Sequence, residues 1–299
     1  MTLGFAIASW EESAGPAVIV VADSRLTSEH ATLSDQYVKT YEIGGRSAII
    51  AAGNALPAIN AADIVRPVIE NHNRHNTEPM GFYDSVRLFA FFLRRVSQGP
   101  RWSSQVAVVG FLQSGRPCIA YLVISPNRNR VRFFSVNVGQ NKVIPVGNRE
   151  ASQFLLQGLA TAHEENKPIL QSGVSLLWYM SSHSGAFDSV GGGLTIGTCA
   201  IDNEHFSWPI IEIDGHNFLR GFDVTEYIRP SWPPAIQVHY DQDWCSTLDQ
   251  QINSNSEHIH EHVTIAGAGY EIDELSTPES LFQMHDDPEE FQNGIALSD

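Results

Sequence analysis

Residues 2–27, TLGFAIASWEESAGPAVIVVADSRLT, contain two apolar runs joined by a short polar loop. The runs 3–10 and 17–23 are rich in Val, Ile and Ala, which is typical of buried strands, so the segment predicts a β-hairpin. Antiparallel pairing around the EESAGP loop places the residue before the first strand opposite the end of the second. The pattern therefore predicts that Thr2 lies beside Asp23.

A second hairpin follows, formed by the runs 37–43 and 47–52 around Gly44-Gly45. This register places Lys39 opposite residue 50 and leaves Gly53 near the same edge. Provided that all these strands share one sheet, four residues that could take part in catalysis lie together at that edge. They are Thr2, Asp23, Lys39 and Gly53.

The remainder of the chain alternates in blocks of strands and helices. Helical periodicity predicts two helix pairs, with Pro67 a kink in the first helix, and apolar runs predict strands between and after these pairs. The expected helices are 55–73, 82–97, 150–163 and 168–182, and the expected strands are 105–112, 117–124, 130–136, 142–147, 194–202 and 206–214. This order predicts an α+β fold in which two antiparallel sheets are each covered by one helix pair.

The charge is unevenly distributed along the 299 residues, whose formal net charge is −16. Residues 230–299 contain fourteen Asp and Glu and no Lys or Arg, whereas the first 229 residues are close to neutral. An acidic chain of this kind is a poor partner for nucleic acid, which requires a basic surface. We accordingly expect a main domain at 1–221 and an acidic C-terminal extension at 222–299, ordered at best in part, with AIQVHY and HEHVTIAG as short strand candidates.

Location and metal binding are constrained by what the sequence lacks. It has no apolar run of about 18 residues and no basic flank of a signal peptide, so we expect a cytoplasmic protein without membrane contact. Cys118, Cys199 and Cys245 have neither disulfide nor zinc spacing. His258, His260 and His262 in HIHEH share one face of a strand, but a solvated strand explains them better than a metal. SVGGG lacks the phosphate-binding pattern, and no cofactor is expected.

The four gathered residues fit one chemistry if Met1 is removed. The hydroxyl of Thr2 would be the nucleophile, and its own α-amine, with an ordinary pKa of about 7.7–8.0, would be the base. Lys39 would lower the pKa of that amine, Asp23 would orient Lys39, and the N–H of Gly53 would stabilise an oxyanion. Each residue alone also fits an ordinary strand end or solvated edge, so the prediction depends on the combination.

The stretch TLGFAIAS, VIVVADSRLT and YVKTYEIGGRSAIIAAGNA resembles the N-terminal part of proteasome β-type subunits. It is similar also to their bacterial relatives, the ATP-dependent protease of the heat-shock locus and the type called Anbu. These proteins are N-terminal-nucleophile (Ntn) hydrolases. The resemblance covers the first 60 residues well and continues loosely to about residue 215.

The resemblance implies a four-layer αββα sandwich in which Thr2 is the catalytic threonine. Asp23 and Lys39 match the supporting pair, and Gly53 matches the oxyanion glycine. Asp188 and Ser189 in FDSVGGG match the later Asp and Ser of the family site. Asn148 in PVGNRE stands where the family has a serine that assists the amine, and the acidic extension has no counterpart in the family.

The resulting hypothesis is a threonine-type hydrolase that cleaves amide bonds, with peptides as the expected substrates, through an acyl-enzyme on Thr2. The resemblance further implies a homo-oligomeric ring, to which an ATP-dependent unfoldase could deliver substrates. Two alternatives stay open. One is an inactive scaffold that binds a partner through its acidic tail, and the other is an amidase or acylase that acts on a small amide.

Overall fold

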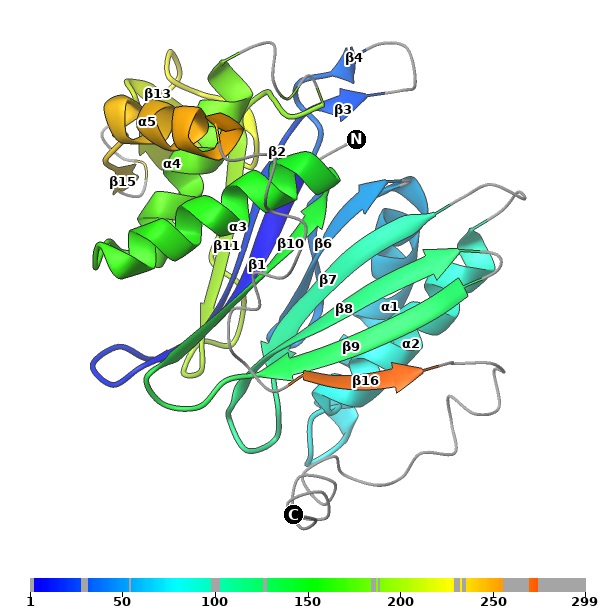
Figure 1. The fold of residues 1–299 in the computed structure, drawn as a ribbon. Helices are drawn as coiled ribbons and strands as arrows, with labels where there is room; N and C mark the ends of the chain where they lie inside the picture. Colours follow the sequence, from blue (N-terminus) through cyan, green and yellow to red (C-terminus); the bar gives the residue numbers. More distant parts are fainter. Residues whose placement is uncertain are drawn as a thin grey trace.

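The computed structural model describes residues 3–27, 32–53, 55–97, 103–125, 128–183, 187, 189–228, 232, 235–254 and 269–273 (Figure 1). The helices are α1 (Ala55–His75), α2 (Phe82–Val96), α3 (Arg149–Glu164), α4 (Ile169–Ser182) and α5 (Gln242–Ser254). The strands of the two larger sheets are β1 (Leu3–Glu11), β2 (Gly15–Asp23), β5 (Thr40–Gly44), β6 (Ser47–Gly53), β7 (Ser104–Phe111), β8 (Pro117–Ser125), β9 (Arg128–Ser135), β10 (Gln140–Gly147), β11 (Leu194–Ala200) and β16 (Gly269–Asp273). Shorter strands are β3 (Leu26–Thr27), β4 (Thr32–Ser34), β12 (Ile211–Ile213), β13 (His216–Leu219), β14 (Phe222–Asp223) and β15 (Ile236–Val238).

Two antiparallel sheets form the centre of the molecule. The first has the order β10-β1-β2-β11, and the second has the order β16-β9-β8-β7-β6-β5. In the first hairpin Gly4 pairs with Ala22 and Glu11 pairs with Gly15. The predicted register of this hairpin is therefore confirmed, and it brings the beginning of β1 to the end of β2.

The two sheets pack against each other through small side chains. The residues that face the opposite sheet include Ala6 and Ala8 of β1, Ala48 and Ala52 of β6, and other alanines and valines in the same cluster. At Gly4 the approach is too close for a side chain, since a Cβ there would lie 2.0 Å from Cδ1 of Ile50. Alternation along the strands sends the larger side chains to the outer faces.

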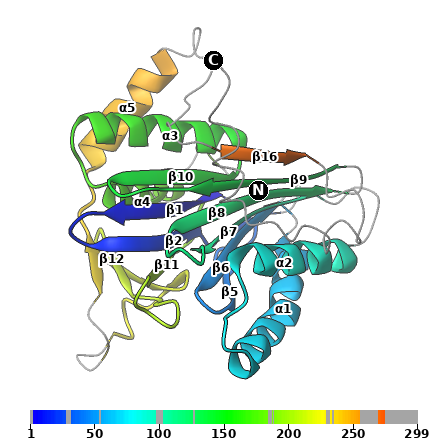
Figure 2. The ribbon, with the colours of Figure 1, turned by 90° about the horizontal axis from the view of Figure 1, so that it is seen from below.

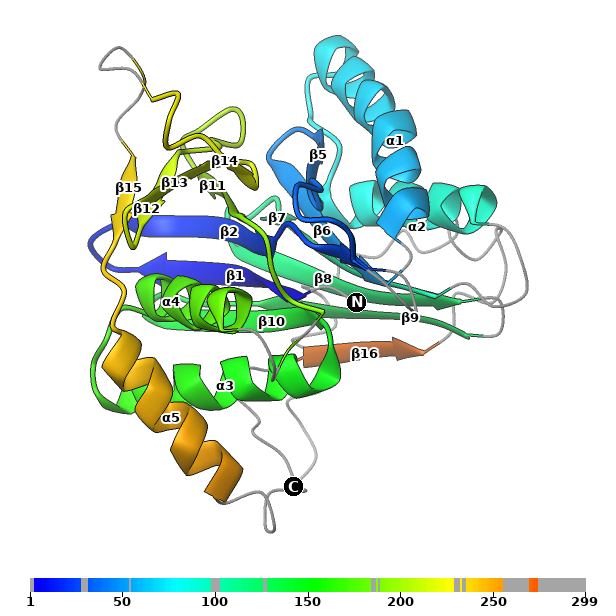
Figure 3. The same ribbon diagram turned by 90° about the horizontal axis from the view of Figure 1, so that it is seen from above.

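Helices cover the outer face of each sheet (Figures 2 and 3). On the first sheet, Phe5 and Ile7 of β1 join a cluster with residues of α3, α4 and α5, such as Leu155 and Leu177. On the second sheet, α1 and α2 bury residues such as Phe89 against β5, β6, β7 and β8. The predicted α+β class and the two helix pairs are confirmed, and each predicted helix is found within three residues of its expected ends.

Three details differ from the sequence-based expectation. The strand expected at 37–43 begins only at Thr40, and it is Thr40, not Lys39, that pairs with Ile50. The strand expected at 206–214 is limited to β12, with Ser207 forming an isolated bridge to Thr198. The first and third differences each place a strand where the chain has no continuous ladder, a distinction that an apolar pattern does not carry.

The chain continues in described elements beyond residue 221, where we expected the main domain to end. β14 and β15 complete a small sheet of order β14-β13-β12-β15, and β16 pairs with β9. Helix α5, which the sequence reading missed, buries Cys245 and Leu248 in the cluster beneath α3 and α4. The strand expected in HEHVTIAG, the HIHEH histidines and most of 271–299 lie outside the described residues.

Candidate active site

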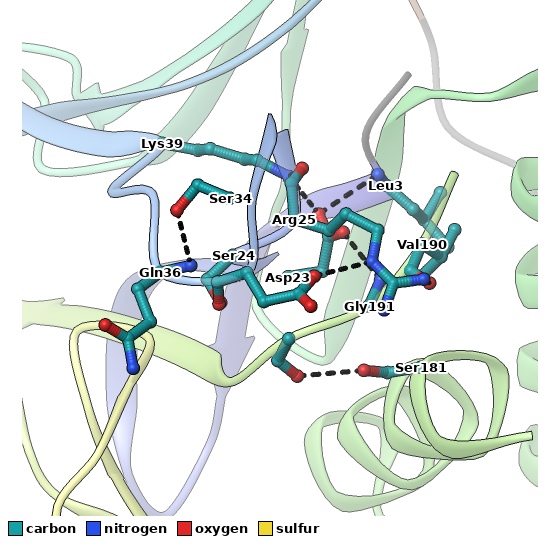
Figure 4. A network of polar contacts seen from close by, with 12 residues as sticks. Leu3, Asp23, Ser24, Arg25, Ser34, Gln36, Lys39, Ser181, Val190 and Gly191 are labelled. Atoms are coloured by element: carbon teal, nitrogen blue, oxygen red, sulfur yellow. Dashed lines mark hydrogen bonds and ion pairs between the residues drawn. The ribbon is translucent and has the colours of Figure 1, made fainter. Parts of the chain in front are cut away.

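The beginning of β1 and the end of β2 meet at a buried carboxylate. The backbone N–H of Leu3 donates a hydrogen bond to Oδ1 of Asp23 at 3.2 Å (Figure 4). The antiparallel register of the hairpin produces this contact. Gly4 pairs with Ala22, so the next position along the ladder brings Leu3 opposite Asp23. Thr2, which is joined to the Leu3 nitrogen by a peptide bond, lies outside the described residues.

Asp23 forms a buried ion pair with Lys39. The ammonium Nζ lies 2.7 Å from Oδ1 of Asp23, and both side chains are 0% exposed. Nζ also donates to the backbone carbonyl of Arg25. Lys39 is the residue before β5, and its own carbonyl accepts a bond from the N–H of Ala51 in β6 at 3.1 Å. The predicted neighbours Asp23, at the end of β2, and Lys39, directly before β5, are therefore brought together. The expectation that their strands share one sheet is wrong, because β2 and β5 belong to two sheets that pack against each other.

Burial changes the ionisation of both partners. Burial lowers the pKa of the Lys39 ammonium, while the nearby Asp23 carboxylate acts to raise it. Burial likewise raises the pKa of the Asp23 carboxyl, against the Lys39 ammonium and the N–H groups of Gly191 and Leu3. Both pKa shifts have the same main cause, the loss of water around a charged group, and the attraction between the two groups opposes both.

The glycine run after Ser189 lies against the same carboxylate. The N–H of Gly191 donates to Oδ2 of Asp23 at 3.0 Å. A Cβ at Gly191 would lie 2.2 Å from Cζ of Arg25, and one at Gly192, where φ is +75°, would lie 2.3 Å from the carbonyl oxygen of Asp35. The SVGGG run is explained by this close backbone approach to the Asp23 site.

Asn148 and Ser189 are in contact beside this loop. The Oδ1 of Asn148 accepts from the N–H of Ala151 at 3.0 Å and caps the N-terminus of α3, while its Nδ2 donates to Oγ of Ser189 at 3.2 Å. The amide thus joins the first turn of α3 to the loop that encloses Asp23. Asp188, the other predicted residue of this loop, lies outside the described residues.

Gly53 is the last residue of β6, at the end of the strand next to which Lys39 lies. It is two residues beyond Ala51, whose N–H binds the Lys39 carbonyl, and its φ is +75°. A Cβ there would lie 2.8 Å from the carbonyl oxygen of Ser103, so the position requires glycine for two independent reasons. Gly53 thus follows Ala51, the residue bonded to Lys39, by two positions along β6.

Arg25 and Asp35 belong to this network, and the sequence reading missed them. Nε of Arg25 lies 2.6 Å from Oδ1 of Asp35, and Nη1 donates to the carbonyl of Val190 at 3.2 Å. Oγ of Ser24 donates to the carbonyl of Asp35. The position of Arg25 directly after the predicted Asp23 was a signal that could have been used. Asp35 had none, because its approach depends on the short strands β3 and β4.

Other features lie away from this site. A cleft of about 410 Å³ is present at the opposite end of β5, lined by residues that include Arg46, Asn73, Phe82, Phe111 and Gln113. Within the described ranges, no three His, Cys, Asp or Glu residues are grouped as they would need to be to hold a metal ion. None of the helices in the described part of the chain is long and apolar enough to cross a membrane.

Comparison of the chain with models of known protein families found no match, and comparison with curated proteins found none.

Proposed function

We propose that the chain is a threonine-type Ntn hydrolase with the four-layer αββα sandwich of proteasome β-type subunits. The observation that carries this proposal is that the N–H of Leu3 and the ammonium of Lys39 bond the same oxygen of Asp23. The buried ion pair is thus adjacent to the point where Thr2 joins the described chain. Two sheets that face each other, each covered by helices, support the same proposal.

The proposed reaction begins once Met1 is removed. The free α-amine of Thr2 accepts the hydroxyl proton, and Oγ attacks the carbonyl carbon of the amide substrate. The N–H of Gly53 would donate to the oxyanion of the tetrahedral intermediate, a type of contact worth about 3 kcal/mol. The intermediate expels the amine, which takes the proton from the α-ammonium, and leaves an ester on Thr2. Water, activated by the same α-amine, then hydrolyses the ester and restores the threonine.

The residues around Thr2 have separate roles in this proposal. The Lys39 ammonium favours the neutral form of the α-amine, and Asp23 fixes Lys39. Gly191 and Leu3 supply the remaining donors to Asp23. Ser189, held by Asn148, would assist the amine from the other side, with Asp188 as a further proposed member of the site. No cofactor takes part in these steps.

A peptide epoxyketone tests the proposal, because it forms a ring with both Oγ and the α-amine of an N-terminal threonine. We expect an intact mass without Met1 and an adduct that mass spectrometry locates on residue 2. Thr2→Ala provides the control and should form none. An unmodified wild-type protein that retains Met1 would contradict the proposal, since a blocked α-amine cannot act as the base.

The inactive scaffold is a second candidate, favoured by one observation. The Asn148 amide is engaged with Ala151 and Ser189 at the position where the resemblance implies a proton-relaying serine. A scaffold would show no adduct even after Met1 is removed. Light scattering coupled to size-exclusion chromatography would separately test the proposed homo-oligomeric ring, and a monomer or dimer with an adduct would favour the small-amide hydrolase.

A further inference from the structure

The two-residue turn between β13 and β14 has positive φ at both positions, as type I′ hairpin turns do. Arg220 has a φ of +52° and Gly221 a φ of +87°. The turn type requires this region at both positions, and glycine, Asn and Asp are preferred there, so an arginine at the first position is uncommon. The contacts of Arg220 and Gly221 should therefore show what the turn is built to do.

Arg220 holds the first residue of β5. Its Nη2 donates to the carbonyl of Thr40 at 3.0 Å, and its guanidinium stacks over the ring of Trp208 at 4.7 Å. Nε1 of Trp208 in turn donates to Oε1 of Glu42 at 2.8 Å. Because β5 is the edge strand of its sheet, the arginine supplies a donor that no neighbouring strand provides.

Gly221 contacts the end of β2. Its N–H donates to the carbonyl of Leu194 at 3.0 Å, and Leu194 is the residue that pairs with Asp23. A Cβ at Gly221 would lie 2.7 Å from Cβ of Ser24. The turn thus touches Thr40, which directly follows Lys39, and Ser24, which directly follows Asp23.

We infer that Arg220 is a positioning residue that sets the placement of Lys39 against Asp23. Two hydrogen bonds fix the backbone at Lys39. The N–H of Ala51 donates to the carbonyl of Lys39, and Arg220 donates to the carbonyl of the next residue, Thr40. The charged groups that face the Lys39 ammonium are Asp23, Arg25 and Asp35. The catalytic consequence of this inference rests on the proposed hydrolase function, whereas the structural consequence does not.

Stability alone gives little reason for an arginine at this position. Nε of Arg220 and Oγ1 of Thr40 are both buried and lack a hydrogen-bond partner among the described residues. A buried donor without a partner offsets much of what the stacked guanidinium contributes. Arg220→Met keeps apolar contact with Trp208 but removes the stacked guanidinium and the bond to Thr40, so a matched control must lose the same two kinds of contact.

Arg46→Met is a matched control at the opposite end of β5. The Arg46 guanidinium also stacks over an aromatic ring, that of Phe111 at 5.3 Å, and also donates to a carbonyl, that of Ile201. It therefore loses the same two kinds of contact without touching Thr40 or Lys39. Arg220→Lys is the conservative variant, because an ammonium can still donate to the Thr40 carbonyl.

Two readouts separate the inference from the hydrolase proposal. The first is the rate of epoxyketone adduct formation on Thr2, measured across pH. The second is NMR of protein labelled at the lysine ε-methylene carbons. The chain has only three lysines, Lys39, Lys142 and Lys167, so two signals in each spectrum serve as internal controls.

For Arg220→Met we expect the adduct rate to fall roughly 10- to 100-fold, as small misplacements at a catalytic site do. The Lys39 signal should shift while those of Lys142 and Lys167 stay in place, and Arg220→Lys should recover part of both effects. Arg46→Met should change neither. An unshifted Lys39 signal in Arg220→Met, or equal losses in Arg220→Met and Arg46→Met, would overturn the inference. A shifted signal in a protein that forms no adduct would support the positioning and refute the hydrolase.

Discussion

The two ends of β5 carry the same local contact in different settings. At one end Arg220 stacks on Trp208 and binds the carbonyl of Thr40, beside a fully buried ion pair. At the other end Arg46 stacks on Phe111 and lines an open cleft of about 410 Å³. The same stacked arginine can therefore have different effects on a functional site, depending on which residue's backbone carbonyl it binds.

The two ends of β5 also differ in whether protein groups or water stabilise their carboxylates. At the Asp23 end, two backbone N–H groups and one ammonium bind a single carboxylate from which water is excluded. At the cleft end, the acidic residues Asp202 and Glu204 are exposed and keep their hydration. Substitutions at the first end should therefore have larger effects than matched ones at the second, and this difference can be measured.

The largest effect on stability is expected for Lys39→Met. It leaves the Asp23 carboxylate buried without its cation, and removing one partner of a buried pair costs about 3–5 kcal/mol of unfolding free energy. Chemical denaturation at neutral pH measures this loss. Lys167→Met, which removes an ammonium stacked on Trp244 at 4.1 Å, should cost only about 0.5–1 kcal/mol. Equal costs for the two variants would refute the distinction between the buried site and the surface.

Gly191→Ala should come next. The added methyl would lie 2.2 Å from Cζ of Arg25, so the guanidinium must move and its bond to Val190 weakens. We expect a loss of about 1–3 kcal/mol, the usual range for an overpacked position. Gly81→Ala at the cleft end is the control, since its Cβ would meet nothing closer than 3.7 Å and should cost less than about 1 kcal/mol. Thermal unfolding of the two variants would show the difference, which a cost at Gly81 as high as that at Gly191 would contradict.

Asn148→Ala should have a smaller effect on stability. It removes the cap of α3 and the bond to Ser189, for an expected loss of about 1 kcal/mol. Asn148→Ser keeps a capping oxygen, and its stability should stay within about 0.5 kcal/mol of the wild type. Denaturation midpoints test both variants, and a cost for the serine variant as large as for alanine would show that capping is not what Asn148 contributes to α3.

The smallest effect is expected for Arg46→Met. Its guanidinium is half-buried and its stacking contact is of a kind worth about 0.5–1 kcal/mol. The same variant should leave epoxyketone reactivity unchanged, and a rate assay beside a thermal scan measures both. A marked loss of reactivity would mean that the two ends of β5 are coupled, which no contact of Arg46 with the described residues indicates.

The sequence predicts the parts of this arrangement that depend on local pattern. Alternating apolar runs with a short polar loop define the first hairpin, and its register brings Leu3 to Asp23. The helices α1 to α4 follow from periodicity, because their apolar faces recur at helical spacing. The closeness of Lys39 to Asp23 was predicted on the condition that both hairpins share one sheet, and that condition is wrong. The two residues meet because their two sheets pack face to face, and the register of Lys39 was also wrong by one residue.

The sequence does not predict contacts made by loops that are distant along the chain. Gly191 donates to Asp23 across 168 positions, and Arg220 reaches Thr40 across 180. Such contacts arise from the packing of the two sheets and from turns without periodicity, so neither strand register nor helical spacing encodes them. Helix α5 was missed for a related reason: few of its side chains are apolar, and its burial depends on α3 and α4.

The central claim is that the Asp23–Lys39 pair tunes the amine at the start of the chain, and the pH dependence of adduct formation on Thr2 tests it most directly. In the wild type the rate should rise with a midpoint below the ordinary α-amine pKa of about 7.7–8.0. Lys39→Met should move that midpoint upward, because it removes a cation and leaves a carboxylate, while Lys39→Arg should hold it near the wild-type value. A midpoint identical in wild type and Lys39→Met, or no adduct on Thr2 at any pH, would contradict the account.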